Sequence, residues 1–294
     1  MSRIRRSPEC ALERLKPNEK PVVKLVVCDI DGTLIDDAGR IPARNLRAFA
    51  ELRRQNIPYT LATGRMDRMA RVYVQQLDVQ VPIIACNGAI IRDCATDEVL
   101  ARQALDPADA AAIVAWMREH GLDFLCYSAD DVYYPAGSQR IERFREFNLA
   151  MQQTGQQPIQ LCPLQQVPTD TFLRSLVKIL AVVPDARTLA CVRAMLAEKT
   201  HCSGLLSGPS FLDIQDTSAT KGHALRELTA MLQIPLAQTM VLGDHDNDVA
   251  MLEIAGIGVA MAGASQPALA AAHYRARAHH ASGVAQALSC LALA

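Results

Sequence analysis

Two aspartates with a fixed spacing follow a run of apolar residues near the start of the chain. Asp29 and Asp31 belong to the segment DIDGT, directly after VVKLVVC. On an extended chain, side chains two residues apart point in one direction, and Gly32 lets the backbone turn sharply away. Carboxylates held this close repel each other unless a cation or a reaction compensates their charge. The pattern indicates a cation-dependent reaction or, as the plainer alternative, a solvated turn after a strand.

A second acidic cluster, Asp244-His245-Asp246-Asn247-Asp248, follows the apolar run TMVLG. Hard oxygen ligands of this kind suit Mg²⁺. We expect Asp244 to bind the metal directly and Asp248, one turn into the next helix, to orient a metal-bound water. Asp248 would also fit a carboxylate that only stabilises a helix N-terminus. No second histidine lies at ligand spacing from His245, so we expect that residue to be exposed in a loop.

A hydroxyl and a lysine have the types and positions to bind phosphate. Thr63-Gly64-Arg65 ends another apolar run and precedes a helical pattern, where a hydroxyl and backbone N–H groups can hold an anion. Taken alone, Thr63 fits a helix cap better, and Arg65 could be a phosphate contact or a surface charge. Lys221 opens a predicted helix, where the macrodipole disfavours a cation without an anionic partner. We expect the Asp29 carboxylate and a bound phosphate as its partners, with a solvated surface lysine as the alternative.

The elements that must position these residues alternate between strand and helix. Apolar, β-branched runs at 22–30, 57–63 and 81–86 predict strands buried on both faces, which is typical of a parallel sheet. Helical periodicity at 41–56 and 65–77 lies between them. This rhythm predicts βαβ units, and ligands of such sheets bind beyond the carboxyl ends of the strands. The acidic segments and Thr63 fall at those ends.

The alternation of strand and helix patterns is interrupted in the middle of the chain and then resumes. Residues 91–215 combine hairpin, strand and helix patterns without βαβ alternation, which predicts an α+β insert. We therefore predict one discontinuous α/β core with a Rossmann-like parallel sheet, formed by 21–90 and 216–294. Residues 1–20 are polar and are expected to form an extension outside the core.

Composition narrows the class of function. The chain has 294 residues, and 30 Lys and Arg nearly balance 31 Asp and Glu, for a net charge of −1. No global field would draw the protein to nucleic acid or to an anionic membrane. Nine scattered cysteines without a CxxC pair favour free thiols in a reducing compartment. With no signal-peptide pattern and no long uncharged apolar stretch, a cytoplasmic protein without membrane or nucleic-acid partners is expected.

Taken together, the segments DIDGT, LATGR, ATKG and GDHDND resemble the four motifs of the haloacid dehalogenase (HAD) superfamily, in the same order. The insertion point, after Asn87-Gly88-Ala89, resembles that of Cof-type phosphatases with a C2B cap. The resemblance covers residues 21–294. It implies a HAD core with an inserted α+β cap and a phosphoric monoester hydrolase that uses Mg²⁺. It further implies a small phosphorylated metabolite, such as a sugar phosphate or a cofactor phosphate, as substrate, and a monomer or homodimer.

The resemblance also implies a reaction. Asp29 would be the nucleophile that forms an aspartyl-phosphate. Asp31 would protonate the leaving oxygen and later take a proton from the attacking water. Mg²⁺ would be held by the carboxylates of Asp29 and Asp244 and by the backbone carbonyl of Asp31, with Asp248 behind these ligands.

The resemblance assigns the phosphate contacts as well. Thr63, Gly64 and Lys221 would surround the transferring phosphoryl group. Asn247 matches a position that contacts Lys221 or the phosphate. The insert at 91–215 would be the cap that closes over the substrate and excludes water.

Two positions depart from the family pattern. Ala262-Gly263-Ala264 stands where an asparagine is often found between glycine and alanine, and Ser282 stands where an acidic residue is common before Gly283. Both departures leave the four motifs intact, but they weaken any transfer of substrate preference.

Two other functions remain open at this level. A phosphotransferase or phosphomutase would need a second phosphate site in the insert, for which basic residues are candidates, although surface charge explains most of them: Arg102, Arg140, Arg143, Arg145, Arg174 and Lys178. A non-catalytic phosphate-binding protein is the third reading. The intact aspartate pair argues against it.

Overall fold

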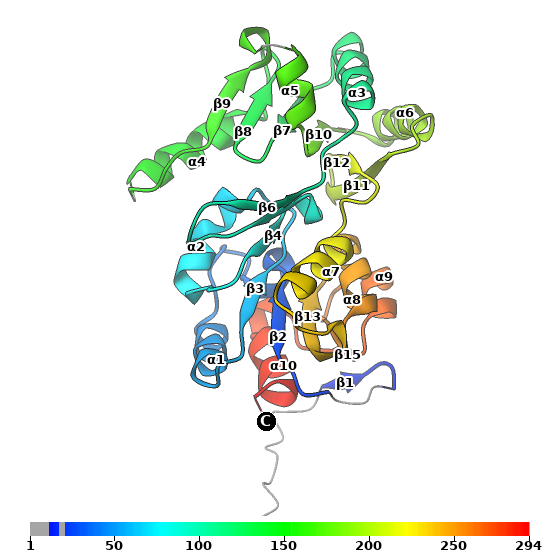
Figure 1. Ribbon diagram of the computed structural model, residues 1–294. Coiled ribbons are helices and arrows are strands. Elements are labelled where there is room, and N and C mark those ends of the chain that lie inside the picture. The colour runs from blue at the N-terminus through cyan, green and yellow to red at the C-terminus, as the bar shows by residue number, and fades with distance from the viewer. Residues whose placement is uncertain (1–11, 18–20, 154, 168, 294) are drawn as a thin grey trace, which may run out of the picture. The chain divides into compact units, whose positions relative to one another are not determined.

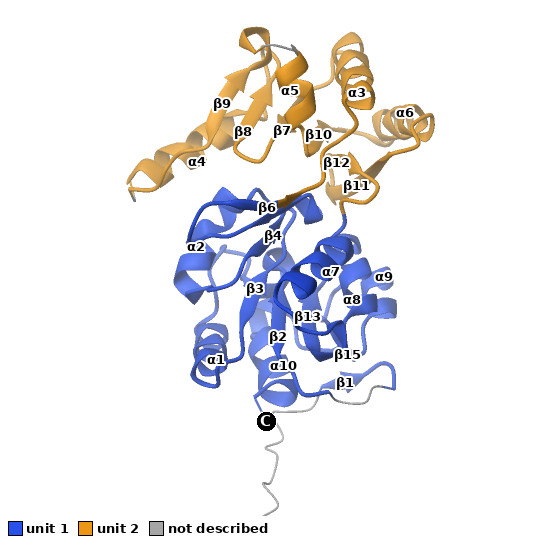
Figure 2. Ribbon diagram, in the orientation of Figure 1, with its two compact units in different colours: residues 1–100, 220–294 blue, residues 101–219 orange. Residues whose placement is uncertain are grey.

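The computed structural model describes residues 12–17, 21–153, 155–167 and 169–293 (Figure 1). The chain forms two compact units, one that runs up to Leu100 and resumes at Thr220, and one made of Ala101–Ala219 (Figure 2). Because the second unit interrupts the first in sequence, the core is discontinuous.

A six-stranded sheet forms the centre of the first unit. Its order is β1-β15-β14-β13-β2-β3, and every neighbouring pair is parallel except β1 with β15. The strands are β1 (Glu13–Arg14), β2 (Leu25–Cys28), β3 (Tyr59–Leu61), β13 (Thr239–Gly243), β14 (Ile257–Ala260) and β15 (Tyr274–Arg275). β2 and β13 are buried along their whole length, as the unbroken apolar runs predict.

Helices cover this sheet. They are α1 (Ala43–Arg54), α2 (Asp67–Leu77), α7 (Lys221–Met231), α8 (Val249–Ile254), α9 (Gln266–Ala271) and α10 (Gly283–Leu291). One hydrophobic cluster joins alternate strand residues, such as Val26 and Met240, to Phe49 of α1 and Leu288 of α10. Side chains of a strand alternate between its two faces, so the neighbours Val27 and Val241, also fully buried, point to the other face of the sheet.

The described part of the N-terminal extension is an edge strand. Glu13 of β1 lies opposite Arg275 of β15, and the two side chains form an ion pair at 3.2 Å. Leu12 packs against the core cluster. Residues 12–17 are therefore attached to the core rather than outside it, which corrects the expectation for this segment. The remainder of this range, residues 1–11 and 18–20, lies outside the described residues.

The strand expected at 81–86 lies in a separate three-stranded sheet of the first unit, and only an isolated bridge from Ile84 to Ala62 continues the parallel order. β4 (Ile83–Ala85) pairs antiparallel with β5 (Ile90–Arg92), and β6 (Val99–Arg102) completes the order β4-β5-β6. The units consequently change at Ala101 and Thr220, whereas the sequence pattern places the insert at 91–215. Pairing of β5 with β4 draws the first residues of that range to the core.

The second unit is an α+β domain. Its six-stranded sheet has the order β11-β12-β10-β7-β8-β9, antiparallel except for β8 with β9. The strands are β7 (Phe124–Tyr127), β8 (Asp131–Tyr134), β9 (Gln160–Pro163), β10 (Lys178–Val182), β11 (Cys202–Gly208) and β12 (Phe211–Asp216), with helices α3 (Pro107–Glu119), α4 (Glu142–Gln153), α5 (Thr169–Ser175) and α6 (Ala186–Ala197). Its own hydrophobic cluster joins α3, through Ile113 and Met117, to Phe124 and Ile179 of the sheet. An α/β core with an α+β insert is the fold class that the sequence predicts.

The cysteines are mostly free thiols, as expected. Seven are free: Cys28, Cys86, Cys94, Cys126, Cys162, Cys191 and Cys202. Cys290 takes part in a disulfide, which corrects the expectation for that residue, and Cys10 lies outside the described residues. Among the described helices, none combines the length and the apolar character needed to cross a lipid bilayer.

Buried Asn45 ties α1 to two other segments, and its removal should destabilise the core. Its Nδ2 donates to the Leu34 carbonyl and its Oδ1 accepts from the Ala285 N–H, both at 3.0 Å. Asn45→Ala leaves the buried Leu34 carbonyl and the half-buried Ala285 N–H unpaired, so we expect a loss of about 2–4 kcal/mol in the free energy of unfolding, measured in urea. Exposed Gln76→Ala is the control and should change it by less than about 0.5 kcal/mol. Equal effects of the two substitutions would contradict this role of Asn45.

Candidate active site

The first aspartate pair lies on a tightly wound turn at the carboxyl end of β2. The Asp29 N–H donates to the Leu242 carbonyl of the neighbouring strand at 3.0 Å. The turn η2 (Ile30–Leu34) follows, in which Gly32 has φ +75°. A Cβ on Gly32 would lie 2.3 Å from Oδ2 of Asp244. Only glycine therefore fits both the backbone angle and the close approach of the second acidic segment.

A buried lysine joins the two acidic segments. Nζ of Lys221 donates to Oδ1 of Asp29 at 2.6 Å and to Oδ1 of Asp248 at 2.7 Å, and the lysine is fully buried. The other oxygen of Asp248 accepts from the backbone N–H groups of Asp244 and His245, at 2.8 and 3.0 Å. Asp248 thus has both oxygens in use, and it holds the loop that carries Asp244.

The site carries more negative charge than Lys221 neutralises. Asp29, Asp244 and Asp248 each offer a carboxylate oxygen, and these atoms lie within 4.8 Å of one another. Burial raises the pKa of Asp29 well above its ordinary value; Lys221 lowers it, while the carboxylates of Asp248 and Asp244 raise it further. Burial also raises the pKa of Asp244, although a hydrogen bond from Thr33 opposes this. Hard oxygen donors around excess negative charge fit a divalent cation such as Mg²⁺.

The lysine keeps its charge in this setting. Burial alone would lower the pKa of Lys221, but the carboxylates of Asp248 and Asp29 more than reverse this, and the pKa lies above its ordinary value. The ammonium therefore remains protonated at neutral pH and supplies a fixed positive charge beside Asp29.

Asp31 lies apart from this cluster and is held by Arg65. Nε of Arg65 donates to Oδ2 of Asp31 at 2.8 Å, and a terminal nitrogen donates to Oδ1. The Arg65 guanidinium also lies over the Tyr73 ring, 5.5 Å from its centroid. The sequence left the role of Arg65 open; the structure makes it the partner of Asp31. Because residues 30–34 form a wound turn, the direction expected for Asp31 from an extended chain does not apply.

Thr63 and Gly64 lie where two loops meet. The buried Thr63 hydroxyl accepts from the Arg65 N–H at 3.1 Å, and α2 begins only at Asp67, so Thr63 does not cap that helix. A Cβ on Gly64 would lie 2.6 Å from Oδ1 of Asn87. The same Asn87 oxygen accepts from Nδ2 of Asn247 at 3.0 Å. Asn247 therefore contacts Asn87, a partner that the sequence did not indicate.

Two contributing residues were missed from the sequence. Thr33, the last residue of DIDGT, donates from its hydroxyl to Oδ1 of Asp244 at 2.8 Å and so orients that carboxylate. Asn87, which was interpreted only as part of a turn, adopts φ +56° in that turn and links Asn247 to the loop of Gly64. Its position in the DIDGT motif could have marked Thr33 as a site residue. No local pattern reveals the contact of Asn87, because its partner lies far along the chain.

The remaining candidates separate into exposed and paired residues. His245 is exposed, as expected. Ser265 follows the segment 262–264, which differs from the family pattern. Its backbone N–H donates to the Asp244 carbonyl at 2.8 Å. In the second unit, Lys178 forms a buried ion pair with Asp213 at 3.1 Å.

The sequence profile of the haloacid dehalogenase-like hydrolases matches residues 26–288. The chain belongs to the haloacid dehalogenase-like hydrolase family. This confirms the superfamily expected from the four motifs and the assignment of the chain as a hydrolase.

Individual relatives match along nearly their whole length. YxeH of Bacillus subtilis is 28% identical over 274 residues, which are 92% of this chain and 99% of the relative. The pyridoxal phosphate phosphatase YbhA of Escherichia coli is 26% identical over 260 residues, 85% of this chain and 92% of the relative. The structure of BT4131, a sugar phosphatase of HAD subclass IIB, superposes with a TM-score of 0.74 at 22% identity and covers 91% of this chain and 98% of that one. These matches agree with the Cof-type branch and with the fold described above.

Replacing the buried Lys221 should destabilise the fold, because the carboxylates around it then repel each other. Lys221→Met leaves Asp29 and Asp248 without their cation, so without divalent metal we expect a loss of about 3–5 kcal/mol in the free energy of unfolding at pH 7. Lowering the pH should recover part of the loss, because protonation of the Asp29 carboxylate removes the repulsion. Lys24→Met, an exposed lysine of the same unit, is the control. Similar losses for both variants would show that Lys221 does not compensate these charges.

Proposed function

We propose that this protein is a Mg²⁺-dependent phosphatase that hydrolyses small phosphorylated metabolites through an aspartyl-phosphate on Asp29. The observation that carries the proposal is the buried Lys221 bound to Asp29 and Asp248, with Asp244 beside them. Such a set gives a nucleophile, a fixed cation and further oxygen ligands in one place. The names of YbhA, a pyridoxal phosphate phosphatase, and of the sugar phosphatase BT4131 support cofactor phosphates and sugar phosphates as the substrate class.

The residues present fit Mg²⁺. The carboxylates of Asp29 and Asp244 and the backbone carbonyl of Asp31 would hold the ion. Asp248, whose oxygens already bind Lys221 and two backbone N–H groups, would support these ligands rather than join them. The bound ion supplies positive charge that offsets repulsion between the carboxylates and an incoming phosphate.

The reaction takes place in two steps at Asp29. Its carboxylate oxygen attacks phosphorus, and the bond to the leaving oxygen breaks while Asp31 gives that oxygen a proton. A water then attacks the phosphorus of the aspartyl-phosphate, Asp31 takes the water's proton, and inorganic phosphate leaves with Asp29 restored. In the structure Arg65 donates to both oxygens of Asp31, so Asp31 must release at least one of these hydrogen bonds before that oxygen can carry the proton that it gives to the leaving group.

The phosphoryl oxygens are bound by donors that the fold has already oriented. Lys221 supplies its ammonium, while Thr63 and Gly64 supply a hydroxyl and a backbone N–H. Asn247 lies at the edge of the group through its contact with Asn87. Donors that are fixed before the substrate arrives need no reorganisation as charge develops on phosphorus.

The second unit, Ala101–Ala219, is proposed as the cap domain that determines which metabolite is accepted. We further propose that the protein acts in the cytoplasm as a monomer or homodimer, because seven of the eight described cysteines are free thiols and only Cys290 takes part in a disulfide. Two of the basic residues considered for a second phosphate site in a phosphomutase, Lys178 and Arg145, already pair with carboxylates, so these two do not support that alternative.

Loss of the nucleophile should abolish turnover. With Mg²⁺ and a panel that includes pyridoxal phosphate and hexose phosphates, the native protein should release inorganic phosphate from at least one compound. Asp29→Asn should lower that rate by at least about a thousandfold, because the amide cannot form the covalent intermediate. Asp37→Asn, which changes an exposed aspartate of the same loop, should retain activity. Activity in Asp29→Asn close to that of the native protein would exclude this mechanism.

Metal should stabilise the folded state through Asp244. Adding Mg²⁺ to protein treated with EDTA should raise the thermal midpoint, because a ligand that binds only the folded state stabilises it by mass action. Asp244→Asn should lose most of this rise, since one anionic ligand is removed. Asp246→Asn, an exposed neighbour in the same loop, should keep it. If Asp244→Asn responds to Mg²⁺ like the native protein, the metal binds elsewhere.

A further inference from the structure

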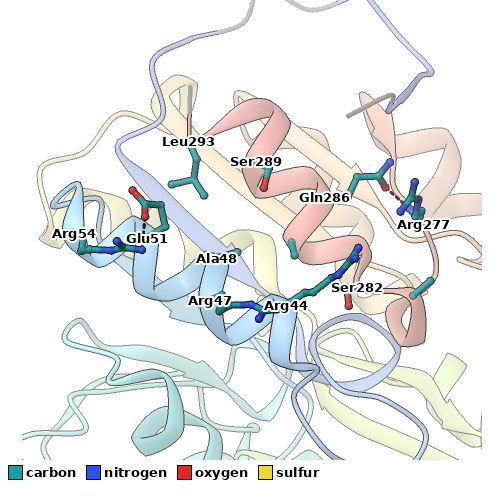
Figure 3. Close-up of a pocket in the computed structure, with 12 residues that line it drawn as sticks. Arg44, Arg47, Ala48, Glu51, Arg54, Arg277, Ser282, Gln286, Ser289 and Leu293 are labelled. Atoms are coloured by element: carbon teal, nitrogen blue, oxygen red, sulfur yellow. Dashed lines mark hydrogen bonds and ion pairs between the residues drawn. The ribbon is translucent and has the colours of Figure 1, made fainter. Parts of the chain in front are cut away.

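A hollow in the first unit lies between α1 and α10, apart from the residues of the candidate active site. Its volume is about 450 Å³, within the range of small-molecule sites. Residues of α1, of α10 and of the segment 277–282 line it (Figure 3). No residue of this lining belongs to the acidic segments, to Thr63 or to Lys221.

The lining is strongly cationic. Arg44, Arg47 and Arg54 extend from α1, and Arg277 precedes α10 (Figure 3). Glu51 is the one carboxylate of the lining, and it pairs with Arg54 at 2.5 Å. Among the described residues, the side chains of the other three arginines form no ion pair. The hollow therefore keeps an excess of three positive charges within a chain whose net charge is −1.

This placement does not help α1 to fold. Arg44 lies in the first turn of the helix, where the macrodipole disfavours a cation. Arg47 follows three residues later, and like charges at this spacing repel each other across one helix face. Each effect costs a few tenths of a kcal/mol, so neutral or acidic residues would serve the isolated helix better. A bound anion turns both repulsions into attraction.

The other lining groups define the kind of anion. Guanidinium groups bind phosphate oxygens through paired N–H donors. Ser282 and Ser289 add hydroxyl groups, and Gln286, whose side-chain oxygen accepts from the backbone N–H of Arg277 at 2.9 Å, adds a carboxamide. Ala48, Ala285 and Leu293 add apolar surface. We propose that this hollow binds a small organic phosphate or diphosphate with more than one negative charge, at a second site distinct from that of phosphoryl transfer.

Binding of inorganic pyrophosphate to the full-length protein tests the proposal. Calorimetry in EDTA, without divalent metal, separates the two sites, because the uncompensated carboxylates of the active site then repel anions. The double variant Arg44→Gln/Arg47→Gln should bind pyrophosphate at least about tenfold more weakly than the native protein, since two charge-assisted contacts are lost. Arg53→Gln is the matched control: it removes the same charge from the same helix, but Arg53 pairs with Asp78 outside the hollow. The affinity of Arg53→Gln for pyrophosphate should equal that of the native protein.

Three results of the binding experiment, and one of the kinetics, would overturn the proposal. The three binding results are no measurable binding by the native protein, an undiminished affinity in the double variant, and an equal loss in Arg53→Gln. The Michaelis constant of the double variant for a turned-over phosphate ester, measured with Mg²⁺, should equal that of the native protein. A raised value would assign the pyrophosphate to the active site instead. If the double variant does not fold, Arg277→Gln, which lies outside both helices, should show the same loss of binding.

Discussion

The buried contact of Lys221 with Asp29 and Asp248 is the constraint on which the site depends. Charges removed from water are tolerated only when each has a partner at close range. This contact joins segments near residues 29, 221 and 248, so the core can close only in a geometry that brings all three together. The same closure places Asp244 beside Asp29, because the second oxygen of Asp248 holds the Asp244 and His245 N–H groups. The arrangement that pairs the buried charges is therefore the same one that brings the candidate catalytic residues together.

The register of the parallel strands brings the two acidic segments together. Cys28 of β2 lies opposite Leu242 of β13, so the residues that follow these two strands emerge side by side at the same edge. The Asp29 N–H continues this pairing by donating to the Leu242 carbonyl. At such short range any side chain at position 32 would collide with Asp244. The glycine of DIDGT is thus fixed by packing between two loops as much as by its own turn.

Features that depend on local pattern could be predicted from the sequence, and features that depend on distant contacts could not. Unbroken apolar runs identify β2 and β13, and the acidic segments after them identify the site edge. The orientation of Asp31 could not be inferred, because it depends on a wound turn and on Arg65, which approaches from another strand end. The polar segment at 12–17 gave no sign that β1 would pair with β15, since an edge strand of two residues needs no apolar pattern. Asn87 was missed for the same reason, because only folding brings Asn247 to it.

Local charge matters more in this molecule than net charge. A net charge of −1 removes long-range attraction to a polyanion or to a membrane, but electrostatic interactions between exposed charges decay over about 8 Å in physiological salt. Within that distance the carboxylates around Asp29 form a region that favours a cation, whereas the arginines of α1 form a region that favours an anion. The opposite charges of the two regions cancel in the net charge of the chain, but each region keeps its own local electrostatic field. Each region therefore retains by itself the local field that a small ion or a small phosphate requires.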